Sequence, residues 1–177
     1  MTRVVTALIL AGLCGTAAAD VKLTGDNTKV EFTGRKPDGK HDGGFKLLKG
    51  TLTAPGGDVA KGSIEVTIDT DSLYSDHPGL TKHLKNGDFF DCKTHKSATF
   101  KSTKIEKATG AGKFTVTGDL TLCGKTQSIS FPADITVNAG RATLASEFSI
   151  DRTQFGMTYG KGKIEDKVAL RIKVDAK

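Results

Sequence analysis

The sequence predicts an all-β domain of about eight antiparallel strands, each with one apolar and one polar face. The first observation is strict alternation of apolar and polar residues, clearest over residues 113–122. The second is punctuation by glycine-rich breaks, such as residues 110–112 and 138–140. Because parallel strands need long crossover connections, short breaks indicate antiparallel pairing. Alternation alone leaves a closed barrel and a two-layer sandwich equally open.

The predicted strands follow one another along the chain with only one helical interruption. Four of them alternate clearly, and the other four are weaker because glycine or consecutive polar residues disturb the pattern. In order, the predicted strands are residues 29–34, 45–53, 64–68, 97–105, 113–122, 127–137, 142–150 and 167–175.

The first nineteen residues have the composition of a secretory signal peptide. Arg3 precedes an apolar run over residues 4–13, which is too short to span a bilayer, and three alanines at positions 17–19 suit a cleavage site before Asp20. The predicted domain is therefore residues 20–177, and the expected location is periplasmic or secreted. A lipoprotein anchored at Cys14 is the alternative, which the large residue before that cysteine disfavours.

The charges indicate a solvated basic surface. The chain carries 26 Lys and Arg against 20 Asp and Glu, a formal net charge of +6. The lysines are scattered among acids, as in residues 104–107, whereas nucleic-acid sites gather cations and interleave aromatic residues. We expect no nucleic-acid partner, and we expect transient contact with anionic membrane surfaces.

Residues 75–87 break the alternation and predict one short helix of about nine residues. Pro78 suits the first turn, Ser75 or Asp76 can cap it, and Gly87 can end it.

The helix predicts a cover for one end of the sheet. Leu80 and Leu84 share one helical face, and Phe89 and Phe90 follow directly. A helix this short is stable only when it packs on an apolar surface. The four side chains are therefore expected to plug or gate the mouth of the fold.

Three segments resemble the signature stretches of the YceI-like family: residues 83–100, 116–132 and 149–157, in the same order and spacing. The resemblance covers essentially the whole predicted domain. It implies an eight-stranded antiparallel lipocalin-like barrel, exported, that holds a polyisoprenoid or quinone-type chain in its lumen and has no shared catalytic residue. The chain is thus expected to be a binding protein without enzymatic activity, and to use no cofactor other than a bound isoprenoid lipid. Two departures are the absence of tryptophan and the polar, glycine-rich stretch 35–44.

Residues that point into such a barrel are the predicted ligand-binding residues. Alternate strand residues face inward, so the lumen is expected to be apolar, and either hollow or filled by its own side chains. Arg152 is expected to form a charged pair or support a turn, with a lipid head group as the alternative. The predicted ligand-binding set is Ile64, Val66, Ile68, Leu80, Leu84, Phe89, Phe90, Phe100, Phe114, Val116, Leu120, Phe148, Ile150, Arg152, Phe155, Leu170 and Ile172.

Two cysteines remain after the predicted cleavage, Cys92 and Cys123. An even count in an exported chain predicts a disulfide, which here would close a loop of about 30 residues and contribute about 3 kcal/mol. Two buried free thiols are the alternative.

Two other functions are kept as alternatives. His77, His83, Cys92 and His95 could form a zinc or hydrolytic site, although their spacing fits no established zinc motif and no metal is predicted. A ligand-free structural or stress-response barrel is the other. Whether the protein is a monomer or a homodimer stays open.

Overall fold

The computed structural model describes residues 18–177, which form an all-β barrel with one α-helix. The predicted signal peptide lies almost entirely outside the described residues, so cleavage and export stay predictions. Within the described residues, no helix is long and apolar enough to cross a membrane. The strands are β1 (Ala18–Thr24), β2 (Thr28–Lys36), β3 (Gly39–Phe45), β4 (Leu48–Pro55), β5 (Ser63–Asp69), β6 (Leu73–Ser75), β7 (Ser97–Lys107), β8 (Lys113–Leu122), β9 (Lys125–Asn138), β10 (Arg141–Asp151) and β11 (Lys167–Ala176), with α1 at Pro78–Leu84 and 3-10 turns η1 (Val59–Lys61), η2 (Thr70–Ser72) and η3 (Arg152–Phe155).

The described residues form eleven strands, so the predicted count of eight is wrong. The prediction missed β1, β3 and β6, each of which continues into or from a predicted strand across a short interruption. A turn separates β1 from β2, two residues separate β3 from β4, and η2 separates β5 from β6. β1 continues into β2, and β3 continues into β4. Because β1 pairs with β4 and β2 pairs with β3, one long hairpin appears as four strands.

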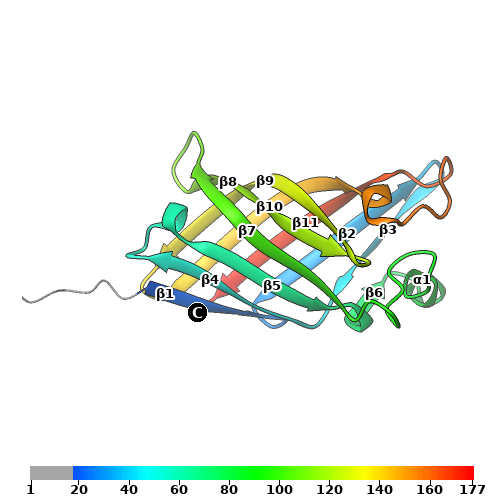
Figure 1. Cartoon of the computed structure of the whole chain (residues 1–177), viewed down its shortest axis with the longest axis horizontal. Coiled ribbons are helices and arrows are strands. Elements are labelled where there is room, and N and C mark those ends of the chain that lie inside the picture. Colours follow the sequence, from blue (N-terminus) through cyan, green and yellow to red (C-terminus); the bar gives the residue numbers. More distant parts are fainter. Residues whose placement is uncertain (1–17) are drawn as a thin grey trace, which may run out of the picture.

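The sheet curls into a barrel, as the family resemblance implied, and does not split into two layers. Its antiparallel order is β1-β4-β5-β7-β8-β9-β10-β11-β2-β3-β6. The two ends of this order meet, because β1 pairs with β4, β6 pairs with β3, and β3 continues into β4 through Lys46 and Leu47. Figure 1 shows the strands wrapping around a common interior, with β1 and the C-terminus at one end and α1 at the other.

The half of the barrel next to the termini is filled by its own side chains. Phe131 stacks face to face on Phe148, with ring centroids 4.3 Å apart, and Phe100 packs against Phe131 at 5.6 Å. The buried members of this packed half are Val21, Leu23, Leu48, Leu52, Ala54, Val59, Ile64, Ile105, Phe114, Val116, Phe131, Ala133, Ile135, Ala142, Leu144, Val174 and Ala176.

The opposite end is covered by a segment that we call the lid, residues 78–92, which contains α1. The predicted helix is present and spans seven residues. Its cap is not Ser75 or Asp76: the ring Nδ1 of His77 accepts hydrogen bonds from the backbone N–H groups of Gly79 and Leu80. The helix ends at Leu84 with Lys85 as its C-cap, so the predicted stop at Gly87 is also wrong.

Candidate functional site

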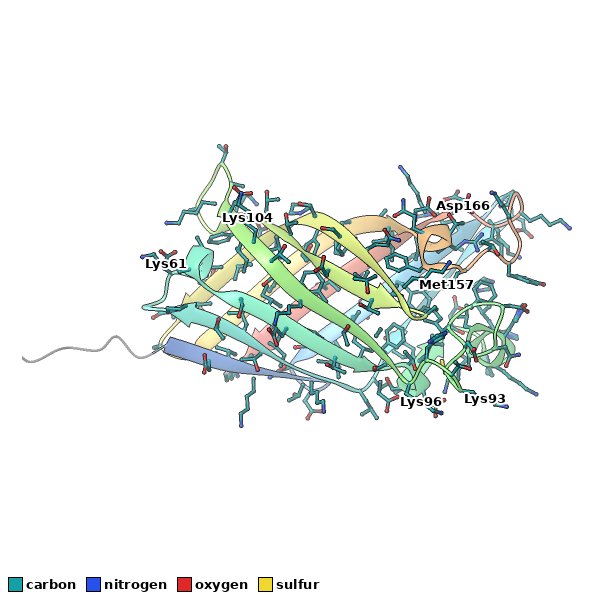
Figure 2. The ribbon with its side chains drawn as sticks, in the orientation of Figure 1. Lys61, Lys93, Lys96, Lys104, Met157 and Asp166 are labelled. Atoms are coloured by element: carbon teal, nitrogen blue, oxygen red, sulfur yellow. The ribbon has the colours of Figure 1, made fainter. Side chains whose placement is uncertain are left out.

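An apolar cavity of about 180 Å³ lies between the packed half and the lid. Strands from opposite sides of the barrel, the lid and the segment after β10 all contribute side chains. Figure 2 shows Met157 and Asp166 of that last segment at the same end of the barrel as Lys93 and Lys96. The lining consists of Val30, Phe32, Gly34, Arg35, Lys36, His41, Phe45, Ile68, Leu80, Leu84, Phe89, Phe90, Leu120, Leu122, Ile150, Arg152, Met157, Ile164, Val168 and Leu170.

About half of the predicted ligand-binding residues lie around this cavity. They come from the mouth-side ends of the strands and from the lid, which the sequence placed at one end of the barrel. Their contact with a ligand stays a prediction. These residues are Ile68, Leu80, Leu84, Phe89, Phe90, Leu120, Ile150, Arg152 and Leu170.

The remaining predicted residues do not line the cavity. Most point inward as expected but lie deeper, in or against the packed half, where neighbouring side chains fill the space. Phe155 belongs to a separate packed cluster with Ala98 and is 1% exposed. The predicted residues outside the lining are Ile64, Val66, Phe100, Phe114, Val116, Phe148, Phe155 and Ile172, and their contact with a ligand stays a prediction.

We call the aromatic stack the floor of the cavity: its rings do not line the cavity themselves but lie beside residues that do. Phe100 is the register partner of Leu120, and Phe148 is the register partner of Leu170. Both partners line the cavity. Since directly paired residues project from the same face of a sheet, Phe100 and Phe148 point inward beside the lining, and both rings contact Phe131 of the packed half.

Several lining residues were not predicted from the sequence, chiefly those of β2 and β3. The alternation of Val30 and Phe32 was a usable signal, since their strand was predicted. Gly43 explains part of the glycine-rich composition of β3, because a Cβ at this position would lie 2.5 Å from the Phe32 ring. The glycine makes room for that ring, so the polar stretch 35–44 forms one wall of an apolar cavity.

The lid is held over the cavity by aromatic contacts. Phe90 packs edge-on against Phe45 with centroids 5.5 Å apart, and lies 6.2 Å from Phe32. Phe89 contacts the ring of Tyr159 at 5.4 Å, on the segment that follows β10. The two adjacent phenylalanines therefore attach the lid to two different parts of the mouth, the β2–β3 wall and the segment after β10.

His83 adds a polar contact to the lid. Its Nε2 lies 2.9 Å from a carboxylate oxygen of Asp88, and its ring packs edge-on against Tyr159 at 4.8 Å.

Arg152 is a structural residue, as the sequence favoured. It is 3% exposed and its guanidinium donates to four backbone carbonyls and one carboxylate. These bonds occupy every nitrogen of the group, so the alternative of a head-group contact is not supported. The acceptors are the carbonyl oxygens of Met157, Tyr159, Ile164 and Glu165 and the carboxylate of Asp166.

The predicted disulfide is not formed in this structure: Cys92 and Cys123 are both free thiols. Cys92 donates to the carbonyl oxygen of Thr70 at 3.2 Å, and Cys123 donates to that of Phe89 at 3.3 Å. Desolvation raises the pKa of Cys123 to about 11, with smaller contributions from Cys92 and Asp91. The pKa of Cys92 is also raised, mainly by desolvation. The Cys123 thiol thus attaches the β8–β9 turn to the lid.

We expect both thiols to react slowly in the folded protein. A pKa of about 11 leaves roughly a hundredfold less thiolate at pH 8 than an ordinary cysteine has. Iodoacetamide labelling at pH 8, followed by intact-mass measurement, should show slow modification of the native chain and rapid modification in urea. The single variants Cys92→Ser and Cys123→Ser assign the rates. Rapid native labelling of Cys123, or a native chain that labels only after reduction, would contradict this expectation.

The four residues of the metal alternative do not converge. His77 caps α1, His83 contacts Asp88 and Cys92 contacts Thr70, each within its own local structure. Among residues 18–177, no group of three or more His, Cys, Asp or Glu side chains could hold a metal ion. The zinc or hydrolytic alternative therefore has no geometric support.

Comparison with known protein families identifies the family to which this barrel belongs. The YceI-like domain family matches residues 22–176. The chain belongs to the YceI-like family. A UPF0312 protein of Vibrio parahaemolyticus is 41% identical over 104 residues, covering 55% of this chain and 54% of its own length. A UPF0312 protein of Serratia proteamaculans is 32% identical over 139 residues, covering 75% and 71%. The chain thus matches about half the length of the first relative.

Solved YceI-like structures share this fold. Burkholderia cenocepacia BcnA superposes with a TM-score of 0.78 at 27% identity, covering 85% of this chain and 96% of BcnA. A polyisoprenoid binding domain from Saccharophagus degradans has a TM-score of 0.69 at 14% identity, covering 91% and 100%. At that identity the second likeness shows the fold alone.

Proposed function

We propose that this chain is an exported lipid-binding protein that holds the apolar tail of a polyisoprenoid or quinone-type lipid for transport or storage. The observation that carries the proposal is the cavity of about 180 Å³ beneath the lid, lined almost entirely by aliphatic and aromatic side chains. Binding needs no covalent chemistry, because burial of each methylene contributes about 0.8 kcal/mol. Transient contact with an anionic membrane surface is part of the proposal.

The cavity limits how much of the lipid is enclosed. An apolar cavity of about 150 Å³ takes up a benzene molecule, so this one encloses roughly one or two isoprene units. The remainder of a longer chain would extend through the mouth, or would require the lid or the aromatic floor to move.

A cavity-filling variant tests the proposal. Val168 lines the cavity beside Ile150, its register partner on β10, whereas its chain neighbour Ala169 is exposed on the outer face of β11. We expect Val168→Trp to weaken binding of farnesol by about tenfold or more, since the indole occupies the space of the tail, at a stability cost of about 1–3 kcal/mol. Ala169→Trp should bind as the unsubstituted protein does. Native mass spectrometry of delipidated protein with added farnesol measures both.

Two results would overturn the proposal. Circular dichroism first establishes that both variants are folded. If the unsubstituted protein takes up neither farnesol nor a longer prenol, the ligand-free structural barrel is the better description. Equal binding by Val168→Trp and Ala169→Trp would place the ligand outside the cavity.

A further inference from the structure

Basic residues near the tip of the β2–β3 hairpin belong to the cavity lining. Gly34 pairs with His41 and Lys36 pairs with Gly39. Directly paired and alternate residues of an antiparallel ladder share a face, so Lys36 and His41 project on the same side as Phe32, toward the cavity. Lys40, between them, projects outward.

The ionisable side chains of the lining are all basic. They are Arg35, Lys36, His41 and Arg152, and no Asp or Glu belongs to the lining. Arg152 is fully occupied by its carbonyl acceptors, as described above. Lys36 lines the cavity while its side chain is 42% exposed, so its methylenes cover apolar surface and its ammonium group reaches water at the mouth.

The present partners of Lys36 and His41 are easily exchanged. Lys36 lies 3.3 Å from Asp38, whose side chain is 76% exposed. His41 lies 3.0 Å from Asp76, and both are partly exposed. Exposed ion pairs contribute little, so an anion delivered by a bound tail can replace Asp38 at small cost.

We propose that the mouth selects amphiphiles whose head group is an anion, a carboxylate or a phosphate, with Lys36 as the principal contact and His41 beside it. This inference rests on the proposed function, because the tail in the cavity brings the head group to the rim. A neutral prenol or quinone fills the same cavity but leaves Lys36 with Asp38.

Paired probes and paired variants test the proposal. Farnesyl phosphate and farnesol share a tail and differ in head-group charge. We expect the unsubstituted protein to bind farnesyl phosphate more tightly, with an advantage that falls as salt is raised. Lys36→Gln should weaken farnesyl phosphate by roughly three- to tenfold and farnesol by less than about twofold, since Gln keeps part of the methylene stem. Lys40→Gln, the same charge change on the outer face of the hairpin, should alter neither. Asp38→Asn should strengthen binding of the phosphate only.

The outcomes distinguish failure of this inference from failure of the proposed function. Failure of both probes to bind the unsubstituted protein overturns the proposed function and the inference together. Equal binding of the two probes, or equal effects of Lys36→Gln and Lys40→Gln, overturns the inference and leaves tail binding intact. Inorganic phosphate alone is expected not to compete with farnesol or farnesyl phosphate at equal concentration. Competition would indicate a free-anion site independent of the tail, and would overturn selection of an amphiphile.

Discussion

Arg152→Met is expected to lower the free energy of unfolding by about 3 kcal/mol or more. The substitution keeps a long apolar stem but removes every donor of a buried guanidinium. Carbonyls of the segment 157–165 lose their partner, and each orphaned buried acceptor costs about 1–3 kcal/mol. Urea denaturation followed by circular dichroism measures the change.

The control for Arg152→Met is Arg171→Met. Arg171 is exposed and its side chain reaches only Glu147, at 2.9 Å, so its loss should cost less than about 1 kcal/mol. A second readout is local: trypsin should cleave at Lys161 and Lys163 faster in Arg152→Met than in the control. If the two variants unfold at the same urea concentration and are cleaved alike, Arg152 does not organise the segment.

The role of Arg152 could be predicted only in outline. The sequence favoured a structural residue near a turn, and η3 is such a turn, with Asp151 accepting from the Thr153 backbone N–H at 2.8 Å. The carbonyl acceptors lie up to 13 residues further along the chain. Backbone carbonyls have no sequence signature, so a cation bonded mainly to them is not distinguishable from one paired with a carboxylate until the loop path is known.

The alternation of apolar and polar residues predicted which side chains point into the barrel, but not which of them lie in the packed half and which line the cavity. Val116 and Leu120 lie on the same inward face of β8, yet Val116 is fully buried in the packed half and Leu120 lines the cavity. Period two fixes which face a residue occupies, and it carries no information about where a filled region ends. That boundary depends on contacts across the barrel, among residues from β7, β9 and β10, which are distant in sequence.

The strand count shows the same limitation. The breaks between β3 and β4 and between β5 and β6 lie at one level of the barrel, and Lys46 and Ser72 are joined there by a backbone hydrogen bond of 3.2 Å. A single interruption in one strand obliges its neighbours to adjust at the same height. Each break spans only two or three residues, and alternation predicted the strand on one side of each break while missing β1, β3 and β6 on the other.

Phe131→Ala is expected to lower the free energy of unfolding by about 3–5 kcal/mol and to lengthen the tail that the protein accepts. Phe131 is 8% exposed and lies between Phe100 and Phe148 in the floor of the cavity. Loss of a buried phenylalanine ring has this effect on stability because both transfer free energy and packing contacts are lost. The vacated space adjoins the cavity, so the enclosed length of a bound prenol should increase.

Phe114→Ala separates these two effects. Phe114 is equally buried, at 8%, in the same packed half, but it is not part of the aromatic stack beside the cavity. Both variants should be destabilised to a similar degree, as measured by urea denaturation. Only Phe131→Ala should shift the ratio of geranylgeraniol to farnesol affinity in favour of the longer prenol, in native mass spectrometry. An equal shift in both variants would mean that general loosening, and not removal of the floor, admits the longer chain. No shift in either would mean that the tail does not reach Phe131, and that the lid and mouth alone set the length that binds.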